Sequence, residues 1–88
     1  MNLNLSDIQQ ALLRVQPHLQ PTPLLRCTAL EKELNFNGQI YLKCECDQPT
    51  GSFKVRGAFN AISALTAEQK QKGVVTRSSG NFAQAVAY

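Results

Sequence analysis

The fold is decided by residues 42–58, whose sequence is LKCECDQPTGSFKVRGA. Apolar and polar side chains alternate over residues 39–44, and this pattern predicts a β-strand. A loop follows that contains Pro49 and Gly51, and Ser52 then stands where a helix N-cap is expected. The helix is indicated by apolar residues at helical spacing, namely Val55, Ala58, Phe59, Ile62 and Leu65. This stretch therefore predicts a strand, a loop and a helix in succession.

The same order of elements is repeated downstream. Thr66 and Gln69 have the spacing of a capping box and predict that the helix restarts there and closes at Gly73. Residues 74–76 (VVT) are typical of a short buried strand, residues 78–81 (SSGN) of a turn, and residues 82–88 of a further helix. Two strand–loop–helix units in a row predict an α/β protein with parallel strands and flanking helices.

Upstream of residue 42 the sequence predicts two helices and a short strand. Ser6 and Gln9 suggest a capping box at the start of a first helix, which Pro17 ends. A short strand is expected over residues 24–26. Thr28 and Glu31 suggest a second capping box, which opens a short helix. The apolar stripe of the first helix consists of Ile8, Ala11, Leu12 and Val15.

Composition excludes several classes of protein. The chain has 88 residues, of which 43% are apolar, and a formal charge of +3. An intrinsically disordered tail would have fewer apolar residues, and no apolar run is long enough to form a transmembrane helix. The nine basic residues are interleaved with acids rather than clustered, so neither a nucleic acid nor a membrane is expected as a partner. An odd number of cysteines and no secretory signal predict a reducing, cytoplasmic location.

Lys54 is the first candidate for a catalytic residue. It falls in the first turn of its predicted helix, where the positive end of the helix dipole and the nearby Arg56 would both disfavour a charged amine. A neutral amine is what a Schiff-base nucleophile requires. The alternative is a lysine that simply points into water.

The turn at Ser78, Ser79, Gly80 and Asn81 is the second candidate site. It follows a predicted strand and opens a helix, so its free backbone N–H groups could hold a carboxylate or a phosphate. The alternative is plain helix capping by serine or asparagine. A metal site is not expected, because the spacing of the potential ligands fits no zinc motif. Those potential ligands are His18, Cys27, Cys44 and Cys46.

Three segments resemble the serine/threonine dehydratase family, which depends on pyridoxal phosphate. Residues 42–58 resemble the segment that attaches the cofactor, and residues 78–87 resemble the substrate loop. Residues 21–24 (PTPL) fit the N-terminal pattern of that family. The resemblance implies a tryptophan synthase β-like fold, known as fold type II among pyridoxal-phosphate enzymes.

The resemblance also implies roles for individual residues. Lys54 would hold pyridoxal phosphate as a Schiff base and take the α-proton of the substrate. Ser52 and Phe53 would frame the cofactor, and Asn81 would bind its 3′-oxygen. The substrate carboxylate would be held by Ser78, Ser79, Gly80 and Asn81. The implied reaction is elimination of water from L-threonine or L-serine, which gives a 2-oxo acid and ammonia.

Some features separate the branches of this family. Val55 and Phe82 stand where cysteine synthases and threonine synthases have aspartate and threonine, so those branches are disfavoured. Phe82 also departs from the histidine usual in the dehydratases. Ser79 resembles the acid/base serine of serine racemases, so racemisation remains an alternative. A further alternative is a non-catalytic truncated product that only self-associates.

The resemblance predicts a chain that completes neither domain of the enzyme. Residues 1–67 would be the N-terminal part of the large domain, and residues 68–88 would begin the small domain. The glycine-rich loop that holds the cofactor phosphate in the family is missing from this sequence. We therefore expect an N-terminal fragment of a longer enzyme that cannot catalyse alone. The partners implied for the enzyme are a small amino-acid substrate and a second copy of itself in a dimer.

Overall fold

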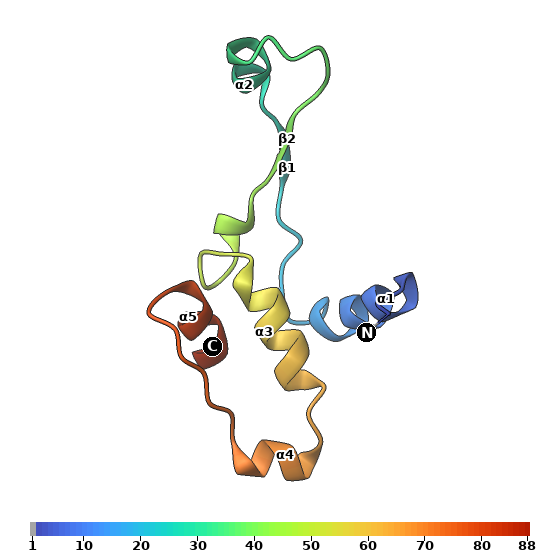
Figure 1. The fold of residues 1–88 in the computed structure, drawn as a ribbon, viewed down its shortest axis with the longest axis vertical. Coiled ribbons are helices and arrows are strands. Elements are labelled where there is room, and N and C mark those ends of the chain that lie inside the picture. Colours follow the sequence, from blue (N-terminus) through green and yellow to red (C-terminus); the bar gives the residue numbers. More distant parts are fainter. Residues whose placement is uncertain (1) are drawn as a thin grey trace.

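The structure is a computed structural model that describes residues 2–88. An arm made of β1 (Leu24–Arg26), α2 (Thr28–Glu33) and β2 (Tyr41–Lys43) extends away from the remaining helices (Figure 1). Those helices are α1 (Leu5–Val15), α3 (Lys54–Ser63), α4 (Ala67–Lys72) and α5 (Asn81–Ala87), and the short 3-10 helix η1 (Glu45–Asp47) follows β2. The molecule is elongated, with extents of 53 × 31 × 26 Å.

The prediction of parallel strands is wrong for the sheet that forms. β1 and β2 pair antiparallel, with Leu25 opposite Leu42. Residues 74–76 are not a strand, and within residues 2–88 no strand lies beside them to accept their hydrogen bonds. The side chain of Val75 is fully exposed, with a relative accessibility of 101%. A single extended segment cannot satisfy its own backbone groups, so it stays irregular.

Glu31 closes the far end of the arm. Its carboxylate accepts hydrogen bonds from Arg26 Nε at 3.0 Å and from the backbone N–H of Ile40 at 2.8 Å. The predicted capping box therefore does not form: Thr28 is the first residue of α2, and the N-cap, Cys27, makes no side-chain capping bond. The carboxylate of Glu31 instead ties α2 to the last residue of β1 and to the residue before β2.

The ends of α1 and α4 follow local signals, with one displacement. The predicted cap at Ser6 is wrong, because Asn4 caps α1 and exchanges hydrogen bonds with Asp7. Thr66 and Gln69 form the predicted capping box at α4. Gly73 ends that helix with φ at +75°, a conformation that favours glycine.

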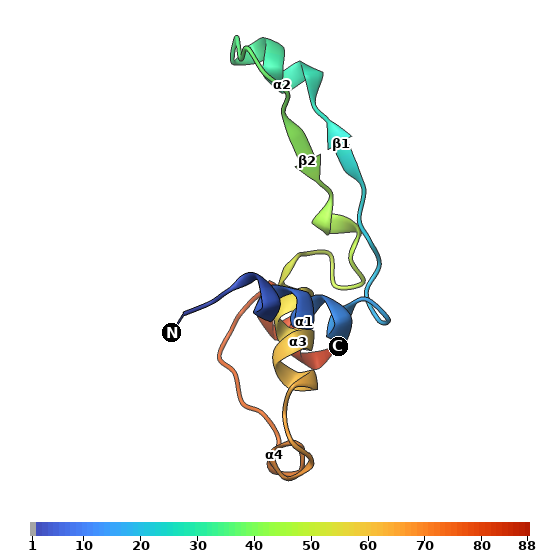
Figure 2. The ribbon, with the colours of Figure 1, turned by 90° about the vertical axis from the view of Figure 1, so that its right-hand side faces the viewer.

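The core lies where α1, α3 and α5 meet, and it is small. Its buried apolar side chains are Val15, Leu19, Val55, Ala58 and Ala85, with Phe59 and Val86 packed against them. α3 runs between α1 and α5 in Figure 1, and α1 overlaps α3 in the view of Figure 2. His18 packs its ring against that of Phe59, with 4.8 Å between the ring centroids. The α3 helix is therefore the element against which the others are placed.

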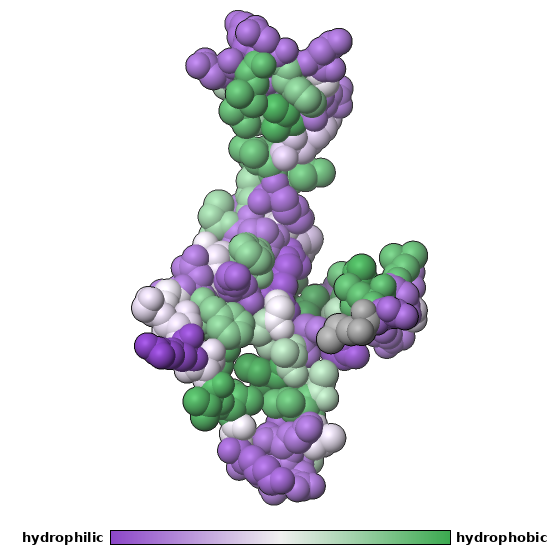
Figure 3. All heavy atoms as spheres, in the orientation of Figure 1, coloured by the Kyte–Doolittle hydropathy of each residue, from purple (hydrophilic) through white to green (hydrophobic). Residues whose placement is uncertain are grey.

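Much apolar surface stays exposed. Figure 3 shows apolar residues gathered at the tip of the arm, on α1 and below α5. On α1 these side chains include Leu5, Ile8 and Leu13, and on the arm they include Leu24, Leu34 and Phe36. Apolar side chains thus make up much of the surface of α1 and of the arm.

No helix in residues 2–88 is long and apolar enough to cross a membrane. In the same residues, no group of three or more His, Cys, Asp or Glu side chains is placed to hold a metal ion. His18 and the three cysteines, which are free thiols, thus do not form such a group.

Candidate functional site

Lys54 is the first residue of α3, and its side chain is exposed. The predicted N-cap is displaced by one residue, because Phe53 occupies the N-cap position. Ser52 is buried, and its hydroxyl accepts a long hydrogen bond of 3.4 Å from the backbone N–H of Lys54. The amine of Lys54 lies 4.8 Å from the centroid of the Phe53 ring. In the described residues this cation–π contact is the one interaction of the amine, so it is accessible to an incoming carbonyl group.

A cluster of polar side chains lies on the other side of α3 from Lys54, at the base of the arm. Glu45 is its centre, and its carboxylate accepts hydrogen bonds from Arg56 Nε at 2.7 Å and Arg56 Nη2 at 2.8 Å. Thr22 Oγ1 donates to the same carboxylate at 2.5 Å, and Gln48 Nε2 donates at 3.3 Å. We call Thr22, Glu45, Gln48 and Arg56 the Glu45 cluster.

Electrostatics keep the cluster charged at neutral pH. The hydrogen bonds from Arg56 lower the pKa of Glu45 to about 2, although burial alone would raise it. The same pairing raises the pKa of Arg56. The sequence suggested that Arg56 acts on Lys54, but its guanidinium is directed to Glu45 instead.

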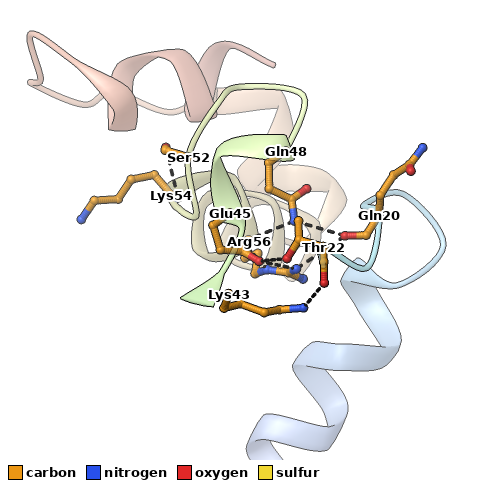
Figure 4. A network of polar contacts seen from close by, with 8 residues as sticks. All are labelled: Gln20, Thr22, Lys43, Glu45, Gln48, Ser52, Lys54 and Arg56. Atoms are coloured by element: carbon orange, nitrogen blue, oxygen red, sulfur yellow. Dashed lines mark hydrogen bonds and ion pairs between the residues drawn. The ribbon is translucent and has the colours of Figure 1, made fainter. Parts of the chain in front are cut away.

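The cluster joins three parts of the chain. Gln48 Nε2 and Arg56 Nη2 donate to the backbone oxygen of Gln20, at 3.2 Å and 3.5 Å. Lys43 Nζ donates to the backbone oxygen of Thr22 at 2.6 Å. The segment before β1, the loop after β2 and the first turn of α3 are thereby held together (Figure 4). Sequence reasoning missed this cluster, because Glu45 and Arg56 lie eleven positions apart with an irregular loop between them.

The turn before α5 carries the second set of predicted residues. Ser78, Ser79, Gly80 and Asn81 are all exposed. Gly80 is the N-cap of α5, and no side chain caps this helix. The hydroxyl of Ser78 accepts a 3.3 Å hydrogen bond from the Gly80 N–H. The alternative of plain helix capping by serine or asparagine is therefore not what forms.

The two candidate sites lie on packed helices, but they do not touch. α3 and α5 pack against each other through the core, and Lys54 opens one helix as Asn81 opens the other. The loop before α5 returns to the end of α3 at which Lys54 lies (Figures 1 and 2). Within residues 2–88 no hydrogen bond joins the Lys54 amine to residues 78–81. The structure thus brings both sites to one end of the helix pair and leaves the space between them open.

These residues fit part of a pyridoxal-phosphate site. An accessible lysine amine suits a carbonyl cofactor, and an uncapped turn with hydroxyl and amide groups suits a carboxylate. The five glycines are distributed singly from Gly38 to Gly80, so this sequence has no glycine-rich phosphate cradle.

Comparison with known proteins agrees with this reading. The family described as "Pyridoxal-phosphate dependent enzyme" matches residues 15–88. A catabolic L-threonine dehydratase of Staphylococcus aureus is 45% identical over 85 residues, which cover 97% of this chain and 24% of that protein. A serine racemase of Oryza sativa is 44% identical over 84 residues, which cover 96% of this chain and 24% of that protein.

The structural comparison gives the same result. The structure of maize serine racemase superposes with a TM-score of 0.87 at 42% identity, over 99% of this chain and 27% of that one. The chain therefore has the architecture of the N-terminal part of fold type II pyridoxal-phosphate enzymes, as the resemblance predicted. It spans about a quarter of the length of the curated relatives it matches. With a family match over residues 15–88 and relatives of this similarity, the chain belongs to the pyridoxal-phosphate-dependent enzyme family.

Proposed function

We propose that this chain carries the cofactor-attaching lysine of a dehydratase that acts on L-threonine or L-serine. The enzyme would eliminate water from the amino acid and release a 2-oxo acid and ammonia. The observation that carries this proposal is the position of Lys54, an accessible amine at the start of α3 on the end of the helix pair that also bears the Ser78–Asn81 turn.

Each candidate residue has a distinct task in this proposal. Bound pyridoxal phosphate would supply an electron sink for the negative charge that develops at the α-carbon. The Lys54 amine would take the α-proton, with the Phe53 ring beside it at 4.8 Å. The uncapped N–H groups and side chains of residues 78–81 would hold the substrate carboxylate, and Asn81 would also bind the cofactor 3′-oxygen. Ser52 would support the cofactor from its buried position.

The second candidate function is racemisation of serine. It is supported by the hydroxyl of Ser79, which is exposed in the turn and could exchange a proton on the face opposite Lys54. Relatives of both kinds, named threonine dehydratase and serine racemase, match at nearly equal identity. A change of Ser79 to alanine separates the two functions, because it would abolish racemisation and leave elimination in place.

The complete site requires more than these residues. We propose that residues 1–67 belong to the large domain and residues 68–88 to the small domain of such an enzyme, and that the 88-residue chain is inactive alone. The enzyme would act in the cytoplasm as a homodimer, with a small amino acid as its substrate. The exposed apolar side chains of α1 and the arm support an assembly in which other protein covers them.

A chimeric enzyme tests this function. Residues 1–88 replace the matching quarter of the Staphylococcus aureus threonine dehydratase, and formation of 2-oxobutyrate from L-threonine is measured. We expect activity in the chimera, its loss in Lys54→Ala, and no loss in Lys70→Ala, which removes an exposed lysine of α4. A folded, cofactor-loaded chimera in which Lys54→Ala keeps its activity would refute the assignment of Lys54.

A further inference from the structure

We propose that Glu45 and Arg56 are positioning residues for Lys54. Their ion pair fixes the rotation of α3 about its own axis, and this rotation determines the side of the helix from which the Lys54 amine projects. The functional meaning of this inference rests on the proposed role of Lys54, whereas its geometry does not.

The contacts between Glu45 and Arg56 oppose rotation of α3. Arg56 contacts Glu45 through two nitrogen atoms, so the planar guanidinium fixes an orientation as well as a distance. Thr22 and Gln48 donate to the same carboxylate and hold it from the side of the arm. Gln48 also donates to the backbone oxygen of Gln20. If α3 rotated and Arg56 drew the Glu45 carboxylate with it, the hydrogen bonds from Thr22 and Gln48 to that carboxylate would break.

The geometry of the α-helix relates the side on which Arg56 lies to the side on which Lys54 lies. Successive residues of an α-helix are about 100° apart around its axis, so Lys54 and Arg56 are about 200° apart and project to nearly opposite sides. Val55, between them, is completely buried at 0% accessibility. With Val55 in the core and Arg56 held on Glu45, Lys54 is left to project outward. Figure 4 shows its amine directed away from the Glu45 cluster.

The charges around Glu45 favour a pair that stays ionised. The cationic groups near it are Arg56 of α3 and Lys43 of β2, and Lys43 is engaged with the backbone oxygen of Thr22. The Glu45 side chain is 16% exposed and that of Arg56 is 33% exposed. Glu45 is the less exposed partner, so removal of Arg56 leaves its carboxylate without the nearest positive charge, whereas removal of Glu45 leaves a guanidinium that water can reach.

The inference is tested on the 88-residue chain by a signal that reports where Lys54 lies. Reductive methylation with ¹³C-formaldehyde labels every lysine amine, and Lys54→Arg identifies the Lys54 signal by its loss. Phe53 would turn together with α3, so the reference is a nitroxide label on the exposed turn before α5, attached at Ser78→Cys in a chain whose Cys27, Cys44 and Cys46 are changed to serine. The label broadens the Lys54 signal according to its distance from the amine. The variants are Glu45→Gln, Arg56→Gln and the double variant, which leaves no charge unpaired. Glu68→Gln is the matched control, because it breaks the exposed pair with Lys72.

In the folded variants of the pair we expect the broadening of the Lys54 signal by the label to change, and in Glu68→Gln to stay as in the parent chain. The helical circular dichroism of each variant shows whether it is folded. A Lys54 signal with the same broadening as in the parent chain, in any folded variant of the pair, overturns the inference. Loss of helix in all three variants also contradicts it, because the pair would then sustain folding rather than set a direction. No cofactor is present in this measurement, so the inference and the proposed function can fail separately.

Discussion

Arg14 of α1 donates a 2.8 Å hydrogen bond to the side chain of Asn60 in α3, across 46 positions of the chain. The bond lies at the surface, whereas Val15 beside it is buried in the core. Exposed hydrogen bonds contribute little, so we expect Asn60→Ala to lower the free energy of unfolding by no more than about 1 kcal/mol. Urea denaturation followed by circular dichroism measures this. A loss several times larger would mean that the polar contact, rather than apolar burial, holds α1 in place.

Val55 should contribute far more to the stability of the fold than Asn60 does. Its side chain is completely buried where α3 meets α1 and α5, so Val55→Ala should cost about 1–3 kcal/mol of unfolding free energy. Val75→Ala is the matched control, since the same atoms are removed from a fully exposed side chain. Urea denaturation should therefore show a much larger loss of unfolding free energy in Val55→Ala than in Val75→Ala. Equal effects would contradict the placement of the core.

Local signals in the sequence predicted the helices well. Pro17 does follow the end of α1, and the Thr66–Gln69 box and Gly73 do bound α4. The error at the start of α1 is also local, because Asn4 with Asp7 and Ser6 with Gln9 offer the same cap spacing two residues apart. Periodicity alone does not choose between two such boxes.

Contacts between distant residues could not be predicted in this way. The strand pairing depends on how the segment between β1 and β2 turns back, and residues 74–76 have a strand-like composition but no strand beside them. At the site, Lys54 and the Ser78–Asn81 turn were found from short motifs, and their roles stay predictions. Glu45 was missed because its partner, Arg56, is brought to it only by the path of the intervening loop.

Acid should weaken the fold through Glu45. The pKa of Glu45 is about 2 in the folded chain, against an ordinary value of 4.5. The ion pair of Glu45 with Arg56 therefore stabilises the folded state fully at pH values above 4.5. As the pH falls from there toward 2, about 2 kcal/mol of this stabilisation should be lost. Urea denaturation between pH 6 and pH 2 measures the slope, which should be flatter in Glu45→Gln and unchanged in Glu68→Gln. An equal slope in Glu45→Gln and the parent chain would contradict the lowered pKa.

Two glycines should respond in opposite directions to alanine. Gly57 lies inside α3, and apart from its chain neighbours and the nearby backbone of α3 no atom lies within 4 Å of the position of a Cβ, so Gly57→Ala should stabilise the chain by about 0.5–1 kcal/mol. Gly73 has φ at +75°, so Gly73→Ala should destabilise it by about 1 kcal/mol. Thermal unfolding of both variants gives the signs. A stabilising Gly73→Ala would contradict the backbone assigned to the end of α4.

The 88-residue chain should not work as an enzyme by itself. Lys54 and the Ser78–Asn81 turn are present, but the five glycines are spread singly along the sequence and offer no cradle for the cofactor phosphate. The space between the two candidate sites is also open to water, which competes for every polar contact. With pyridoxal phosphate and L-threonine added, we expect no stable lysine–cofactor absorbance near the visible edge and no 2-oxobutyrate. The chimera described above is the positive control, and either signal from the isolated chain, absent from its Lys54→Ala variant, would overturn this prediction.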